Sequence, residues 1–237
     1  MTEWKQKRFW TDAGVAETEG GFAVTLDGRR LRTPAKALLA VPTRALADAI
    51  AAEWAAQEEL VDPRTMPLTR TANSATDKVS VQRAEVADIL AAYGESDLLC
   101  YRAEAPQRLV ARQAEIWDPL LDWAADALQA PLNVGAGVMH VAQPGTSLAA
   151  LHRRVHGMDH WHLAAFHDLV ALSGSLIIAF AVCESDWPRD ALWQASRLDE
   201  DWQIEEWGAD EDAAEVVALK AAAFADAARF YDLLTVA

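Results

Sequence analysis

The spacing of apolar residues changes once along this sequence, and this change constrains the fold more than any other feature. Near the N-terminus, residues 22–26 alternate with a period of two, which is typical of a strand. From about Thr69 onward, apolar residues recur every three or four positions, as on one face of a helix. The sequence therefore predicts the α+β class, with a small N-terminal antiparallel sheet and a helix, followed by a larger all-α region.

Turn and capping residues locate the first elements. Asp27-Gly28 separates two extended runs, which predicts a hairpin, and residues 38–41 predict a third strand. Thr43 precedes a run with apolar residues at Leu46 and Ile50, which is the spacing of an N-capped amphipathic helix. We expect this helix to pack against the sheet.

Helical spacing fills most of the remaining chain. A connector with a proline near each end, residues 62–67, predicts the boundary between an N-terminal α+β domain at residues 1–66 and a helical domain at residues 67–237. Beyond this connector, the predicted helices cover residues 79–92, 106–128, 147–155, 161–183, 188–207 and 210–234.

The acidic charge is concentrated near the C-terminus. The formal net charge is −15, yet residues 1–78 hold eleven basic and eleven acidic side chains, so residues 79–237 carry the whole excess. Residues 184–215 alone hold twelve acids against Arg189 and Arg197. The chain has only five lysines, which argues against binding to nucleic acid. Such an acidic segment can attract a basic partner, hold a cation or aid solubility, and self-repulsion at this charge favours a monomer.

Cysteine usage and hydropathy indicate a protein of the cytoplasm. Cys100 and Cys183 lie far apart in apolar surroundings, which offers neither a disulfide framework nor a cysteine-based zinc site. The N-terminus lacks the apolar region of an export signal. The longest uncharged apolar run, residues 169–183, has fifteen residues, fewer than the roughly 18 that a membrane span needs. We therefore expect a cytoplasmic protein that does not contact membranes.

Five of the six histidines lie between His152 and His167 and suggest a metal site. His152, His156 and His160 are spaced by four, which on a continuous helix would align three imidazoles. Gly157 interrupts this run, and the glutamate of the helical metalloprotease motif is absent. Glycine-rich phosphate loops and nucleophile elbows are absent as well. We predict no catalytic residue, no metal and no cofactor, with a metal-dependent hydrolase as the alternative.

Tryptophan is abundant, and its setting near the C-terminus is unusual. Ten tryptophans are more than a core of this size needs. Trp202 and Trp207 alternate with acids so densely that these side chains cannot all face a core. Aromatic residues with a polar rim are typical anchors of protein–protein interfaces. Residues 199–208 are therefore the candidate binding segment.

Short motifs occur in order along nearly the whole chain. In the first third they are Arg8-Phe9-Trp10, Gly21-Phe22-x-Val24-x-Leu26-Asp27-Gly28-Arg29, Thr33-Pro34, Pro42-Thr43, Glu53-Trp54-x-x-Gln57 and Pro63-x-x-Met66-Pro67-Leu68-Thr69. Later they are Asp97 with Cys100-Tyr101-Arg102, Gln113-x-x-x-Trp117-Asp118-Pro119-Leu120, Ser173-Gly174-Ser175-Leu176 and Leu198-Asp199-Glu200-x-x-Gln203-x-x-x-Trp207-Gly208. Together they resemble the assembly chaperones for the alpha subunit of the catalytic sector of F-type ATP synthase. Because no transit peptide is visible, we expect a bacterial relative of the mitochondrial assembly factor.

This resemblance implies an ATP-independent chaperone, not an enzyme. Such a protein would bind the free alpha subunit, shield the surface that later faces the beta subunit, and promote assembly of the complex. The resemblance also implies an orthogonal helical bundle for the C-terminal domain, and it matches the acidic pair at Asp199 and Glu200 to a position tied to function. With the tryptophans and polar residues of the candidate segment, we predict six client-binding residues, Asp199, Glu200, Trp202, Gln203, Glu206 and Trp207, with Glu200 as the principal acid. A general holdase without a preferred client is a second alternative.

Overall fold

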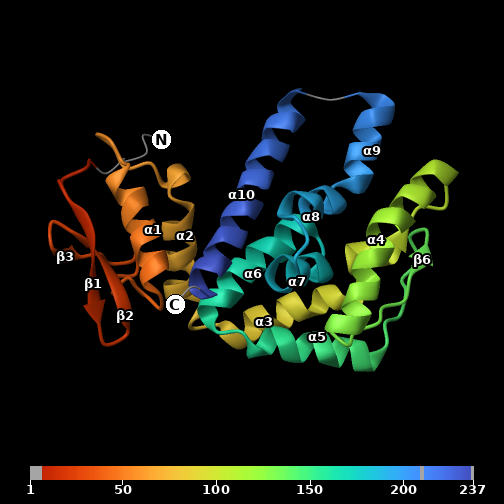
Figure 1. Cartoon of the computed structure of the whole chain (residues 1–237), viewed down its shortest axis with the longest axis horizontal. Coiled ribbons are helices and arrows are strands. Elements are labelled where there is room, and N and C mark those ends of the chain that lie inside the picture. Colours follow the sequence, from red (N-terminus) through yellow and green to blue (C-terminus); the bar gives the residue numbers. More distant parts are fainter. Residues whose placement is uncertain (1–6, 209–210, 236–237) are drawn as a thin grey trace. The chain divides into compact units, whose positions relative to one another are not determined.

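The structure, a computed structural model, describes residues 7–208 and 211–235, which form two compact units (Figure 1). The first unit comprises the chain up to Arg83, together with His160–Ala165 and the residues from Arg229 onward. The second comprises Ala84–Asp159 and Phe166–Ala228. Helices α6 (His160–Ser173) and α10 (Glu211–Thr235) contribute residues to both units. The predicted division into an α+β domain at residues 1–66 and a helical domain at residues 67–237 stays a prediction.

The first unit is built on an antiparallel sheet around strand β2 (Gly21–Leu26). Strand β2 pairs with β1 (Ala13–Thr18), β3 (Arg29–Arg30) and β4 (Ala40–Val41). The predicted hairpin is present, because Asp27 and Gly28 both take the positive φ values, 48° and 77°, that a primed two-residue turn requires. The third strand is shorter than predicted. Strand β1 was not predicted, since Val15 is its only large apolar residue.

Helix α1 (Arg44–Ala55) packs on this sheet, as the sequence predicts (Figure 1). The Thr43 hydroxyl accepts a hydrogen bond from the Leu46 backbone N–H at 3.2 Å and so caps the helix. The core of the unit gathers side chains from the sheet, α1, α2 (Pro67–Ser74) and short parts of α6 and α10. Its buried members are Val24, Leu39, Val41, Leu46, Ala47, Ile50, Ala51, Leu68, Ala72, Ala165, Phe230 and Leu234.

The second unit is helical, which confirms the α+β class with a larger helical part. Helix α7 (Leu176–Glu184) lies at its core, with every side chain from Leu176 to Val182 buried. Tyr101–Arg102 (β5) and Gly135–Ala136 (β6) form a short parallel pair. The other helices are α3 (Arg83–Ala91), α4 (Gln107–Ala127), α5 (Gly145–Gly157), α8 (Arg189–Ser196) and α9 (Leu198–Trp207). Across the described ranges, no helix is both long and apolar enough to cross a membrane.

Three of the predicted helices are wrong in their extent. The predicted helix at 161–183 is divided into α6 and α7, because Gly174 adopts a positive φ of 68° that ends a right-handed helix. The predicted helix at 188–207 is divided at Arg197 into α8 and α9. The predicted helix at 79–92 is shorter in the structure, where α3 spans Arg83–Ala91. An additional helix, α2, precedes it and begins at Pro67, a residue that suits the first turn of a helix.

Candidate functional site

Helix α9 carries the candidate binding segment, and its two faces differ. Leu198 and Trp202 are buried, one turn apart, on the inner face. Gln203 and Glu206 are exposed on the outer face, and the last residue of the helix, Trp207, is 81% exposed. Gly208 ends the helix with a positive φ of 94°. The two tryptophans of this segment therefore have different environments, one structural and one open to a partner.

Asp199 faces inward and is held by a buried glutamine. The side-chain Nε2 of Gln113 on α4 donates to Asp199 Oδ1 at 2.7 Å. Gln113 is only 1% exposed, and its Oε1 accepts a 2.8 Å hydrogen bond from the Ala103 backbone N–H. Asp199 thus joins α9 to α4 and to the segment before α4.

Glu200 points into solvent next to Asp199. Its side chain is 51% exposed and accepts a 3.1 Å hydrogen bond from Arg197 Nη1. The next acid, Asp201, is partly buried, and this burial raises the pKa of its carboxyl; the Arg197 charge opposes the shift and the Glu200 charge adds to it. Of the three acids in the first turn of α9, Glu200 is the one whose side chain is exposed, whereas Asp199 and Asp201 are half-buried.

Basic side chains from α4 offset part of this acidity. Arg112 Nη1 contacts Glu205 Oε2 at 2.7 Å, and the Arg108 guanidinium lies over the Trp202 ring at 5.6 Å from its centroid. Both arginines therefore hold α9 against α4. A groove of about 400 Å³ lies among these helices, lined by Arg112, Ile116, Gln194, Leu198, Asp201, Ile204 and Glu205.

Exposed apolar side chains continue from α9 into α10. Ile204 is 39% exposed, and on the first half of α10 Val216 and Leu219 are 51% and 65% exposed. Residues 213–216 and 218–220 are all exposed, although they are largely apolar. The second unit thus leaves apolar side chains of these two consecutive helices open to solvent, interspersed with carboxylates such as Glu215.

The structure divides the six predicted binding residues into two groups. Glu200, Gln203, Glu206 and Trp207 are exposed, whereas Trp202 is buried and Asp199 is half-buried against Gln113. Four further residues of this surface were not predicted from the sequence: Arg108, Arg112, Val216 and Leu219. The two arginines are spaced by four on one helix face, which was the available signal for a basic strip opposite the acids.

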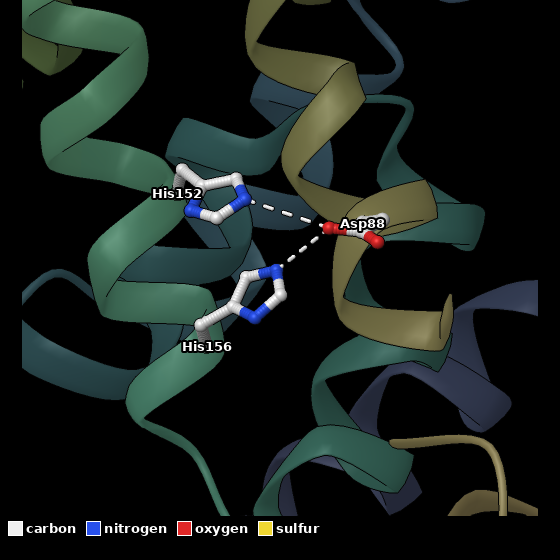
Figure 2. A group of neighbouring side chains, drawn as sticks. All are labelled: Asp88, His152 and His156. Carbon is white, nitrogen blue, oxygen red and sulfur yellow. Dashed lines mark hydrogen bonds and ion pairs between the residues drawn. The ribbon is translucent and has the colours of Figure 1, made fainter. Parts of the chain in front are cut away.

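The histidines are not brought together as a set of three on one helix. Helix α5 ends at Gly157, so His152 and His156 share a helix face, while His160 begins α6. The first two meet Asp88 of α3 (Figure 2). His160 has its ring 4.8 Å from Trp161, His162 lies 5.0 Å from Tyr231, and His167 contacts Asp168.

Comparisons with known proteins agree over most of the chain. A family model described as ATP12 chaperone protein matches residues 7–125. The crystal structure of Atp12 from Paracoccus denitrificans is 50% identical, with a TM-score of 0.94 over 98% of this chain and 100% of that chain. An aspartate-to-lysine mutant of P. denitrificans Atp12p is 49% identical, with the same coverage and TM-score. Mitochondrial protein atp12 of Schizosaccharomyces pombe is 26% identical over 223 residues, which are 89% of this chain and 76% of that protein.

Proposed function

Since this chain belongs to the ATP12 chaperone family, whose members are assembly chaperones of ATP synthase, we propose that its client is the free alpha subunit of the F-type catalytic sector. It would cover the surface of that subunit that later faces the beta subunit, and leave when the ring assembles. The action needs no ATP hydrolysis and no catalytic residue. We further propose that the protein acts in the cytoplasm as a monomer.

The observation that carries the proposal is the exposed tryptophan at the end of an acidic helix. Trp207 is 81% exposed, and a large aromatic side chain left in water is typical of an interface anchor. Ile204, Val216 and Leu219 add exposed apolar surface on the same two helices. An unassembled subunit exposes apolar surface that aggregates unless it is covered, so an apolar partner surface suits its protection.

Charge gives this surface a preference for one kind of client. Glu200, Glu206 and Glu215 are exposed among the apolar side chains, and no basic residue lies between Leu198 and Leu219. A client surface that is apolar at its centre and basic at its rim would therefore be attracted and oriented. Arg112 and Arg197 each already contact an acid of α9, so they offset only part of this field.

The six residues have distinct proposed roles. Trp207, Gln203 and Glu206 would contact the client directly, and Glu200 would supply the orienting charge. Asp199 and Trp202 would act indirectly by holding α9 in place, because they contact Gln113 and Arg108 of α4. The P. denitrificans aspartate-to-lysine mutant retains the fold, with a TM-score of 0.94 to this chain, so reversing one acidic charge in a relative is compatible with the fold.

Co-expression with the alpha subunit tests this proposal. The full chain is purified with the alpha subunit present and the beta subunit absent, and the retained alpha subunit is quantified. We expect Glu200→Lys to keep the melting temperature of the wild type and to lose about tenfold or more of the retained alpha subunit. Asp122→Lys, which reverses an exposed acid on α4, should keep both properties.

Three outcomes would count against the proposal. Equal retention of the alpha subunit by Glu200→Lys and the wild type would show that the acidic segment does not bind the client. Failure of the wild type to retain the alpha subunit would show that the alpha subunit is not the client. Capture of many unrelated proteins in comparable amounts, with no excess of the alpha subunit, would favour a general holdase.

A further inference from the structure

Three potential metal ligands converge on one side of the second unit. His152 and His156 lie one turn apart on α5, and both rings point toward Asp88 of α3 (Figure 2). The Nε2 atoms of His152 and His156 lie 3.5 Å and 2.9 Å from the same oxygen, Asp88 Oδ1. The two rings are stacked, with centroids 4.0 Å apart and planes inclined by 17°. Two imidazole nitrogens and one carboxylate oxygen thus face a common point.

The spacing of these atoms suits a small cation. Zinc binds imidazole nitrogen and carboxylate oxygen at about 2.0–2.2 Å, so two ligand atoms of a tetrahedral site lie about 3.3 Å apart. The two nitrogen–oxygen distances, 3.5 Å and 2.9 Å, bracket this value. All three ligand atoms lie within 4.8 Å of one another, so side-chain rotations would be enough to open the group around one ion.

The surroundings of the group also favour a cation. His156 lies in the last turn of α5, where the helix dipole places partial negative charge. The Asp88 carboxylate neutralises one positive charge of a bound ion, and the chain as a whole carries −15. The side chains of Asp88, His152 and His156 are 64%, 52% and 26% exposed, so an ion can enter from solvent and keep water ligands.

We propose that Asp88, His152 and His156 form a three-ligand site for a zinc-type divalent cation, with water completing the coordination. Two imidazoles and one carboxylate suit zinc and its neighbours in the first transition series better than magnesium or calcium, which prefer oxygen ligands alone. The ion would join α3 to α5 and so stabilise the second unit.

Zinc titration of the full chain tests the site. The protein is purified without a histidine tag, stripped with a chelator and titrated with Zn²⁺ by calorimetry, with Mg²⁺ in excess to occupy weak carboxylate sites. We expect one Zn²⁺ per chain with a micromolar dissociation constant and a higher melting temperature when zinc is bound. Replacing zinc with Co²⁺ should give visible absorption bands from a site with nitrogen ligands.

Variants assign the binding to these three residues. His152→Gln, His156→Gln and Asp88→Asn should each weaken zinc binding by about tenfold or more, and should reduce the zinc-dependent rise in melting temperature at the same zinc concentration. His167→Gln is the matched control, because His167 is half-exposed and contacts a carboxylate, yet lies outside this group. Millimolar binding by the wild type would overturn the proposal. Unchanged zinc affinity in both histidine variants would also overturn it, as would an equal loss of zinc affinity in His167→Gln. If a histidine variant fails to fold, Asp88→Asn provides the same test.

Discussion

The side-chain amide of Gln113 donates a 2.7 Å hydrogen bond to the Asp199 carboxylate, from a position that is 1% exposed. The adjacent acid, Glu200, instead faces solvent and contacts Arg197 on its own helix segment. Two neighbouring acids with similar chemistry thus have different environments: Asp199 is half-buried against Gln113, whereas Glu200 is exposed. Substitutions at the two positions should therefore affect different properties.

Asp199→Ala should destabilise the fold by about 1–3 kcal/mol, because the buried Gln113 amide would lose its acceptor. Urea denaturation monitored by circular dichroism measures the free energy of unfolding. Glu206→Ala, which removes an exposed acid from the same helix, should change this free energy by less than about 0.5 kcal/mol. Equal stability of the two variants would show that the Gln113–Asp199 bond contributes little.

The two tryptophans of α9 should separate stability from client binding. Trp202 is 8% exposed and lies under the Arg108 guanidinium, so Trp202→Ala should cost about 3–5 kcal/mol of stability. Trp207 is 81% exposed, so Trp207→Ala should cost less than about 0.5 kcal/mol while reducing retention of the alpha subunit. Chemical denaturation and the co-expression assay measure these two effects. A stable Trp207→Ala variant with full client retention would argue against its role as an anchor.

A buried carboxylate joins the segment before α4 to the start of α7. Asp97 is fully buried and accepts hydrogen bonds from the backbone N–H groups of Leu99 and Ile177, both at 3.0 Å, and from the Ser175 hydroxyl at 2.8 Å. Asp97→Ala leaves these donors without an acceptor, so it should lower the free energy of unfolding by about 3 kcal/mol or more. Asp122→Ala is the exposed control. A loss below about 1 kcal/mol in Asp97→Ala would mean that water replaces the carboxylate.

Local signals predicted the parts of the fold that depend on neighbouring residues. The turn at Asp27-Gly28 and the cap at Thr43 are both present, because each is determined by the conformational preference or the hydrogen bond of one or two residues. The break at Gly174 was missed, because periodicity showed an unbroken apolar run. The chain after this break is held by a hydrogen bond from the Ser175 hydroxyl to Asp97, which lies 78 residues earlier in the sequence.

Long-range contacts also limited the prediction of the candidate site. The sequence indicated that the tryptophans and acids of residues 199–208 could not all face inward, but the orientation of each depends on α4. Arg112 reaches Glu205 across 93 residues, and Asp88 reaches His156 across 68. A single sequence shows the spacing along one helix, whereas the partner on another helix becomes known only from the fold.

The pKa of His167 should depend on its neighbour Asp168. His167 Nδ1 lies 3.0 Å from Asp168 Oδ1, and this hydrogen bond raises the pKa of the imidazole above 6.5, against the opposing effect of burial. Because the folded state holds the proton more tightly than the unfolded state, the pair stabilises the fold below the unfolded pKa. This stabilisation is lost as the pH rises through the folded pKa. Asp168→Asn should therefore lower the imidazole pKa and reduce stability more at pH values below about 6.5 than in alkaline solution.

Nuclear magnetic resonance titration of the His167 ring protons measures this pKa in the wild type and in Asp168→Asn, and urea denaturation at several pH values measures the stability difference. The urea-unfolded chain supplies the reference pKa, since the Asp168 contact is absent there. An unchanged His167 pKa in Asp168→Asn would show that the carboxylate does not bind the imidazolium in solution. A stability difference that grows with rising pH would contradict the sign of the linkage, because a raised histidine pKa stabilises the folded state only while the imidazole is protonated.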